Sequence, residues 1–247
     1  MTANHCDATR PYTVFVWNFQ NSQCPPGPGD PPNPSTMPRS NGSILLRANS
    51  ASDWNLLGLV QPPAVNYFLG WDSGFWDSFA DGTGIHHPAG LEKSISFGYN
   101  EGAFYGEFCD SNNNCIWAHT WGVRFTTGST LGGSSGSPVM DSSSRVRGTL
   151  TGGYNCDVGY YGRFAHAYDT LEPFINNIAD PVYCDVNYGG DERGTASEPF
   201  DQFREAIFCV LTGHTIRFRP GVYNEQFRIW RPMRLEAEGG LVRIGGP

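Results

Sequence analysis

Short runs of apolar and aromatic residues, separated by turns rich in Gly, Ser and Asn, fill the chain from residue 43 to about residue 167. Three such runs lie at residues 54–60, 122–126 and 147–150. Gly (31) and Pro (18) together make about a fifth of the 247 residues, and 16% are charged, unlike a long helical protein. Short strands at even spacing are typical of sandwiches and barrels, so we predict an all-β fold for this part of the chain.

The pattern changes near residue 181. Residues 169–178 predict a short amphipathic helix that ends at Ala179-Asp180-Pro181, because proline cannot continue a helix. Beyond it, residues 199–211 predict a second helix. Four short strands are expected at residues 215–218, 227–230, 233–237 and 241–244. We therefore expect two domains, residues 1–180 and residues 181–247.

Charge and hydropathy exclude two classes of function. The formal net charge is −8 and no basic stripe is present, so nucleic acid is not an expected partner. No apolar run approaches the roughly 18 residues that a transmembrane helix needs, so no membrane span is expected.

The seven cysteines favour an oxidising compartment, and we expect a secreted protein. Residues 1–6 lack the basic start and apolar core of a signal peptide. The odd number of cysteines favours a sequence that begins within a longer gene product.

Three segments in chain order supply a histidine, an aspartate and a serine in a Gly-rich turn. They are Thr2-Ala3-Asn4-His5-Cys6, Ser52-Asp53-Trp54-Asn55-Leu56-Leu57 and Gly133-Ser134-Ser135-Gly136-Ser137-Pro138. Serine is a weak nucleophile that needs a base within hydrogen-bond reach, and histidine is the natural base near neutral pH. An aspartate orients the imidazole, and glycines beside the serine let backbone N–H groups face a developing oxyanion. The set therefore indicates acyl transfer, without a metal or cofactor.

Each of these segments has a simpler explanation when taken alone, since a Gly-Ser-Ser-Gly run is usually a flexible turn. Asp7 and Asp72 are alternatives to Asp53. Asp72 belongs to a separate Gly-Trp-Asp motif, and the preference for Asp53 over Asp7 rests on the family resemblance given below.

The other histidines carry no clear chemistry. His86 and His87 are sequence neighbours, so on a strand their side chains point to opposite faces. We interpret them as strand and turn residues rather than metal ligands. His119, His166 and His214 lie in no motif and receive no role.

The ordered segments resemble trypsin-like serine peptidases, and most closely the bacterial lysyl endopeptidases. The order His, Asp, Ser matches that fold rather than subtilisin or the α/β-hydrolases. Further segments resemble the same branch: Gly70-Trp71-Asp72, Gly84-Ile85-His86-His87-Pro88 and Tyr161-Gly162-Arg163-Phe164. The resemblance covers about residues 1–178 and implies a chymotrypsin-like double β-barrel. It implies His5 as general base, Asp53 as orienting carboxylate, Ser135 as nucleophile, and the N–H groups of Gly133 and Ser135 as the oxyanion hole.

The positions that recognise a cation in such peptidases are neutral here. The resemblance places Ser129 at the pocket floor, and Gly159 where the lysyl endopeptidases have an aspartate. Thr151, which precedes Gly152-Gly153, stands where those enzymes have a histidine that borders the substrate. We therefore do not expect strict cleavage after lysine. An apolar or small side chain is favoured unless Asp157 reaches the pocket.

Six of the seven cysteines are assigned to disulfides. The expected bonds are Cys6–Cys24, which the resemblance implies, Cys109–Cys115 across a polar turn, and Cys184–Cys209 in the C-terminal segment, with Cys156 left over. In trypsin-like peptidases further strands precede the histidine. Without them we expect an incomplete first barrel and a weakened active site.

Residues 182–247 resemble the start of a right-handed parallel β-helix of the pectate-lyase-like kind, opened by a capping helix. The resemblance rests on Asp185-Val186-Asn187-Tyr188, on residues 199–207 and on residues 215–225, with Pro220-Gly221-Val222-Tyr223-Asn224-Glu225. A solenoid needs about three repeats to bury its own core, and this segment has room for one. Surface or carbohydrate contact is one interpretation. A cap for a longer solenoid is favoured, because the segment holds no catalytic or ligand cluster.

The predicted function is that of a secreted serine endopeptidase, acting on protein or peptide substrates through an acyl-enzyme. The alternative is a catalytically silent binding or adhesion protein that keeps the peptidase scaffold. Such proteins usually lose a triad residue, whereas this sequence keeps all three, which favours the enzyme.

Overall fold

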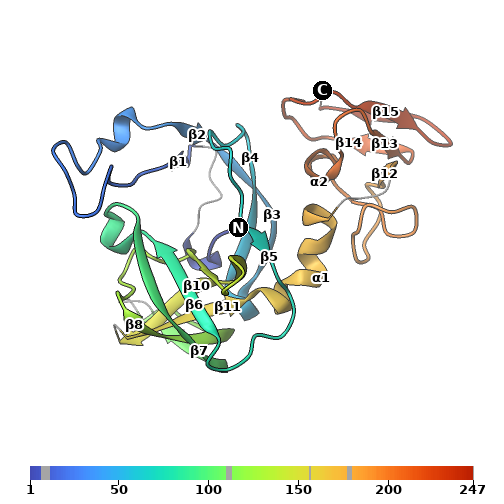
Figure 1. Cartoon of the computed structure of the whole chain (residues 1–247). Coiled ribbons are helices and arrows are strands. Elements are labelled where there is room, and N and C mark those ends of the chain that lie inside the picture. Colours follow the sequence, from blue (N-terminus) through green and yellow to red (C-terminus); the bar gives the residue numbers. More distant parts are fainter. Residues whose placement is uncertain (7–11, 110–112, 156, 177–179, 247) are drawn as a thin grey trace. The chain divides into compact units, whose positions relative to one another are not determined.

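The computed structural model describes residues 1–6, 12–109, 113–155, 157–176 and 180–246, and the described chain is mostly β-structure. It forms two compact units, Met1–Tyr168 and Asp169–Pro247 (Figure 1). The helix α1 (Phe164–Ile175) crosses this division, and the predicted domain boundary near residue 181 lies after it. No helix among the described residues is long and apolar enough to cross a membrane.

A closed β-barrel dominates the first unit. Its strands are β6 (Asp81–His86), β7 (Ser94–Cys109), β8 (Cys115–Thr127), β9 (Pro138–Met140), β10 (Arg145–Asn155) and β11 (Val158–Arg163), with β5 (Gly70–Trp71) added beside β10. The sheet order is β11–β8–β7–β6–β9–β10–β5, and a further antiparallel pairing between β10 and β11 closes the barrel. The barrel contains the sequence-predicted strands at residues 122–126 and 147–150.

The barrel interior is filled by alternate residues of its strands. Trp121, Val123 and Phe125 lie two positions apart on β8, so all three side chains point to the same face. They pack in one buried cluster with Trp76, Val139, Leu150 and Tyr161. This core fixes the strands from which the loops of the site extend.

The residues before the barrel form two small antiparallel sheets. β1 (Val14–Val16) pairs with β2 (Arg39–Asn41), and β3 (Ser43–Asn49) pairs with β4 (Trp54–Leu59). The turn from β3 to β4 is a 3₁₀ helix, η3 (Ser50–Ser52), followed by Asp53. The other 3₁₀ helices of this unit are η1 (Asn4–Cys6), η2 (Pro34–Thr36) and η4 (Pro88–Gly90).

The second unit contains short parallel sheets. Its elements are β12 (Val182–Cys184), α2 (Phe203–Cys209), β13 (Thr215–Phe218), β14 (Gly221–Tyr223), β15 (Arg234–Ala237) and β16 (Val242–Ile244). β12, β13 and β15 pair in parallel, as do β14 and β16. A buried cluster that includes Phe200, Phe203, Ile207, Ile216 and Phe218 lies inside the unit.

Two predicted elements of this region differ from the structure. The helix predicted at residues 169–178 begins earlier, at Phe164, and residues 177–179 lie outside the described part. The strand predicted at residues 227–230 is an irregular segment. Phe227 and Trp230 lie three positions apart, a spacing that would point them to opposite faces of a strand. Both instead pack on the same core, with ring contacts to Phe203 and Phe208 at 4.9 and 4.8 Å.

Candidate active site

Asp53 lies buried at the turn that begins β4, with 1% of its side chain exposed. Its backbone is left-handed, at φ 47° and ψ 54°, a conformation that aspartate tolerates better than a β-branched residue. The turn is closed by a hydrogen bond from the Asp53 amide to the Ser50 carbonyl, at 3.3 Å. A local backbone constraint therefore fixes where the carboxylate points.

His5 is held against this carboxylate by both its backbone and its ring. The His5 amide donates to Asp53 Oδ1 at 3.1 Å, and His5 Nδ1 donates to Asp53 Oδ2 at 2.8 Å. The segment before it pairs with β4, since the amides of Thr2 and Asn55 each donate to the other's carbonyl, at 3.0 and 2.9 Å. The histidine is therefore anchored although it lies close to the first residue.

This hydrogen bond also sets the charge preference of the imidazole. The Asp53 carboxylate raises the pKa of His5 above its usual value, and partial burial of the ring opposes the rise. Because Nδ1 carries the proton that Asp53 accepts, Nε2 is the ring atom available to take a proton from another group.

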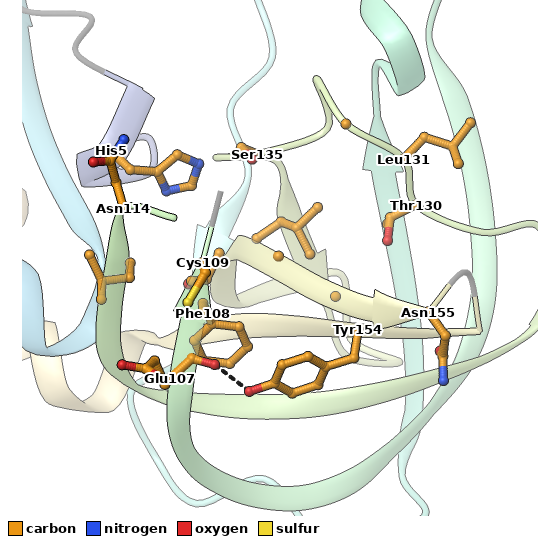
Figure 2. A pocket seen from close by; sticks show the side chains of 16 residues that line it. His5, Glu107, Phe108, Cys109, Asn114, Thr130, Leu131, Ser135, Tyr154 and Asn155 are labelled. Carbon is orange, nitrogen blue, oxygen red and sulfur yellow. Dashed lines mark hydrogen bonds between the residues drawn. The ribbon is translucent and has the colours of Figure 1, made fainter. Parts of the chain in front are cut away.

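Ser135 lies in the loop between β8 and β9, and it lines the same cavity as His5. Figure 2 shows the His5 ring directed toward Ser135. The loop is tied to β10, because Gly136 N donates to Leu150 O and Leu150 N donates to Ser137 O, both at 2.8 Å. The half-buried serine is therefore presented to the cavity from a fixed backbone.

Two glycines beside Ser135 are required by the backbone. Gly133 and Gly136 have φ values of 89° and 80°, a region that residues with a side chain rarely adopt. A Cβ at position 136 would also lie 2.8 Å from the Ala3 amide nitrogen, so only glycine lets the His5 segment approach the serine loop so closely. No hydrogen bond among the described residues uses the amides of Gly133 or Ser135.

A cavity of about 1000 Å³ opens beside His5 and Ser135. Its walls come from three places in the chain: the tip of the β7–β8 hairpin, the loop after β8, and the second half of β10 (Figure 2). Besides His5 and Ser135 the lining residues are Glu107, Phe108, Cys109, Asn114, Ile116, Thr130, Leu131, Gly132, Leu150, Thr151, Gly152, Gly153, Tyr154 and Asn155. Glu107 is the one acidic side chain among them.

A family model for the lysyl endopeptidase C-terminal domain matches residues 1–162. The chain belongs to this family. The match ends inside β11, so the second unit lies outside it. The matched residues include nearly all of the barrel described above, and the family is one of peptidases.

Solved structures of other proteases also resemble the chain. The active form of the Rv3671c protease from M. tuberculosis has a TM-score of 0.44 and 16% identity, and the match covers 54% of this chain and 58% of that one. The HtrA-type protease AlgW with a decapeptide has a TM-score of 0.43 and 13% identity, over 55% of this chain and 41% of that one. The chain therefore spans less than two thirds of either protein.

Three of the five residues predicted to contact substrate line the cavity. They are Thr151, Gly152 and Gly153, on β10. Ser129 and Gly159 are not among the lining residues, and a substrate contact at these two positions stays a prediction. A Cβ on Gly159 would meet the side chains of Phe125 and Leu150 at 3.1 and 3.2 Å, so this position faces the barrel core. Asp157 does not line the cavity either.

The hairpin tip was missed as part of the site. Phe108 stacks on Tyr154 of β10, with ring centroids 5.5 Å apart and ring planes inclined by 14°. The Tyr154 hydroxyl donates to the Glu107 carbonyl, so the hairpin and the cavity wall are joined. The paired Cys109 and Cys115 mark this hairpin in the sequence, but no sequence pattern places its tip beside residues 151–155.

The cysteines are paired in part as predicted. Cys109 and Cys115 form a disulfide, which joins the ends of β7 and β8. Cys6 and Cys24, which were predicted to pair, are both free and exposed. Cys184 and Cys209, the other predicted pair, are both buried. Cys156 lies outside the described residues.

Proposed function

We propose that the chain is a serine endopeptidase in which Ser135 is the nucleophile, His5 the general base and Asp53 the orienting carboxylate. One observation carries the proposal: a buried aspartate binds both the amide and the Nδ1 atom of His5, whose ring faces Ser135 across a shared cavity. A histidine with its Nδ1 proton held and its Nε2 atom facing a serine is the arrangement that acyl transfer requires.

The proposed reaction proceeds in two transfers. His5 Nε2 takes the Ser135 hydroxyl proton as the Oγ atom attacks the carbonyl carbon of the peptide bond. The developing oxyanion accepts hydrogen bonds from the amides of Gly133 and Ser135. These two amides have no other partner among the described residues. His5 then gives the proton to the leaving amine, the acyl-enzyme remains on Ser135, and a water molecule repeats the sequence to release the acid.

The cavity supports a preference for an uncharged side chain before the scissile bond. Leu150, Thr151, Gly152 and Gly153 line it consecutively along β10, and none of these residues carries a charge that could form an ion pair with a lysine. Glu107 is exposed at the hairpin, so a cation on a neighbouring substrate residue is the charge that it would contact. We therefore do not propose strict cleavage after lysine.

The proposal includes secretion and a role for the second unit as the start of a parallel β-helix. The parallel pairings of β12 with β13 and β13 with β15, each made by strands of three or four residues, support the β-helix assignment. The disulfide at the hairpin tip supports an oxidising compartment. In this proposal the second unit is a structural cap that takes no part in the chemistry.

Labelling by a fluorophosphonate probe tests the proposed nucleophile. The chain should be labelled, and the Ser135→Ala variant should lose the label completely. Ser137→Ala is the matched control, because the Ser137 hydroxyl is in the same loop but has no partner among the described residues. Label that persists in Ser135→Ala, or a wild-type chain that stays unlabelled between pH 6 and 10, would leave the silent binding scaffold as the better description.

A further inference from the structure

Three buried polar side chains, those of His86, Ser96 and Ser134, form a hydrogen-bonded series that includes the residue before Ser135. At its centre is His86, the last residue of β6, which is 2% exposed. His86 Nδ1 lies 3.0 Å from Ser134 Oγ, and His86 Nε2 lies 2.9 Å from Ser96 Oγ. Both serines are fully enclosed, so these hydrogen bonds have no competition from bulk water.

The outer hydrogen bonds of this series, made by Ser96 and Ser134, determine where its protons lie. Ser96 Oγ donates to the Ser129 carbonyl at 3.3 Å, so its lone pair is left to accept the proton of His86 Nε2. His86 Nδ1 is then unprotonated and accepts a hydrogen bond from the Ser134 hydroxyl. Ser134 Oγ in turn accepts the Leu131 amide at 3.4 Å. Every group in this hydrogen-bonded series has a partner when His86 is neutral. Burial lowers the pKa of His86, which also favours the neutral ring.

This hydrogen-bonded series contacts the loop between β8 and β9 at two places. Ser129 lies near the start of the loop and Ser134 immediately precedes Ser135, so His86 and Ser96 hold the loop at both places from the neighbouring strands β6 and β7. The middle of the loop is held by a bond from the Ala89 amide to the Gly132 carbonyl, at 2.7 Å.

The segment after His86 also forms the wall on which the loop rests. A Cβ at Gly133 would lie 3.0 Å from the Gly90 amide nitrogen and 3.3 Å from that of Ala89. The loop therefore packs closely against this wall. Small rotations of its peptide planes are restricted, and those planes carry the amides of Gly133 and Ser135.

We infer that His86 is a positioning residue, which acts through Ser134 to hold the amides of Gly133 and Ser135 toward the substrate carbonyl oxygen. The inference rests on the proposed serine peptidase function, which does not itself assign a role to His86 or Ser134. A misplaced donor loses most of its effect, because the stabilisation exists only where the oxyanion forms.

The test compares Ser134→Ala and His86→Asn with Ser137→Ala. Ser134→Ala removes one hydroxyl and leaves the His86–Ser96 bond, so a loss of the fold is not expected. We expect kcat on a fluorogenic peptide to fall by about 10- to 100-fold in both variants, with KM within about twofold of wild type. Ser137→Ala should retain wild-type kcat and KM.

Inhibitors separate positioning from general damage. A peptide aldehyde forms a hemiacetal whose oxygen lies among the oxyanion donors, whereas the matching peptide alcohol binds the same cavity without that oxygen. The aldehyde should lose affinity by the same factor as kcat in Ser134→Ala, and the alcohol should lose none. Equal losses for both inhibitors, or a kcat equal to that of Ser137→Ala, would overturn the inference.

A readout independent of turnover keeps the inference separate from the proposed function. Amide hydrogen exchange of residues 129–137 should be at least about tenfold faster in Ser134→Ala than in Ser137→Ala, with the rest of the barrel unchanged. Unchanged exchange would overturn the inference whatever the activity. A wild-type chain with a protected loop but no turnover that depends on Ser135 would instead overturn the proposed function.

Discussion

Asp53 accepts two hydrogen bonds from His5, one from the amide at 3.1 Å and one from the ring Nδ1 atom at 2.8 Å. The same carboxylate therefore fixes both the position of the backbone and the orientation of the imidazole. The double contact therefore holds the His5 segment and its ring together on the turn that begins β4.

Asp53→Asn should lower kcat by about 10⁴-fold, because an amide at this position favours the imidazole tautomer with its proton on the wrong nitrogen. Asp72→Asn is the control: this aspartate pairs with Arg147 at 2.8 Å and does not line the cavity. Steady-state kinetics on a peptide substrate give the comparison. Similar losses in the two variants would show that Asp53 is not the orienting carboxylate.

The pH dependence of the proposed reaction should follow the protonation of the His5 ring. The base acts only when unprotonated, and Asp53 raises the pKa of His5, so the acid limb of kcat/KM should lie above pH 6.5. In Asp53→Asn the limb should move to lower pH. The rate of fluorophosphonate labelling against pH measures both curves, and a wild-type limb at or below pH 6.5 would contradict the assignment.

Gly136→Ala should abolish most of the activity. The added Cβ would meet the backbone of the His5 segment at Ala3, and the φ of 80° is unfavourable for alanine. A displacement of the histidine by about 1 Å costs on the order of 10²-fold in rate. Gly70→Ala is the control, since a Cβ there meets nothing within 4 Å. Fluorophosphonate labelling rates and melting temperatures of Gly136→Ala and Gly70→Ala test this prediction.

Gly152→Val should narrow the substrate range. A Cβ at this position points toward Phe108, 3.8 Å away, so two further methyl groups would reduce the width of the cavity. We expect kcat/KM to fall most for substrates with large apolar side chains before the scissile bond, and least for those with alanine. A peptide library profiled on both proteins tests this, and a uniform decrease would contradict it.

Removal of the Cys109–Cys115 disulfide should act on substrate binding more than on the chemistry. The bond closes the hairpin that carries Glu107 and Phe108, and the proposed catalytic residues His5, Asp53 and Ser135 lie outside this hairpin. A short loop of this kind contributes about 2 kcal/mol to stability. In Cys109→Ser/Cys115→Ser we expect a raised KM and a lower melting temperature, with kcat nearly unchanged. A large fall in kcat at constant KM would indicate that the hairpin supports the nucleophile directly.

Much of the candidate site follows from residue order, because a histidine, an aspartate and a serine with the right neighbours suggest one chemistry. Their mutual geometry does not follow from order. The double contact of Asp53 depends on a left-handed residue in a turn, and the bond between His86 and Ser134 joins residues 48 positions apart. Such pairings are set by strand register, which sequence alone does not define.

The position of Gly159 outside the cavity lining follows from a simpler pattern. Gly159 and Tyr161 are two positions apart on β11, so they share a face of the strand, and Tyr161 is fully buried in the barrel. A large apolar residue two positions away therefore indicates that the glycine faces the core. The hairpin tip gave no such signal, since its approach to β10 depends on the length and twist of two strands.

The closed barrel is built from residues 70–163, whereas the proposed base His5 and its proposed carboxylate Asp53 come from the residues before it. During synthesis on the ribosome the acid–base pair would emerge first, the nucleophile later, and the closing strand β11 last. The cavity wall on β10 and the loop of Ser135 acquire their support only when β11 pairs with both β8 and β10. In the proposed peptidase, the arrangement that would cleave a peptide bond is therefore complete only after the whole barrel has folded.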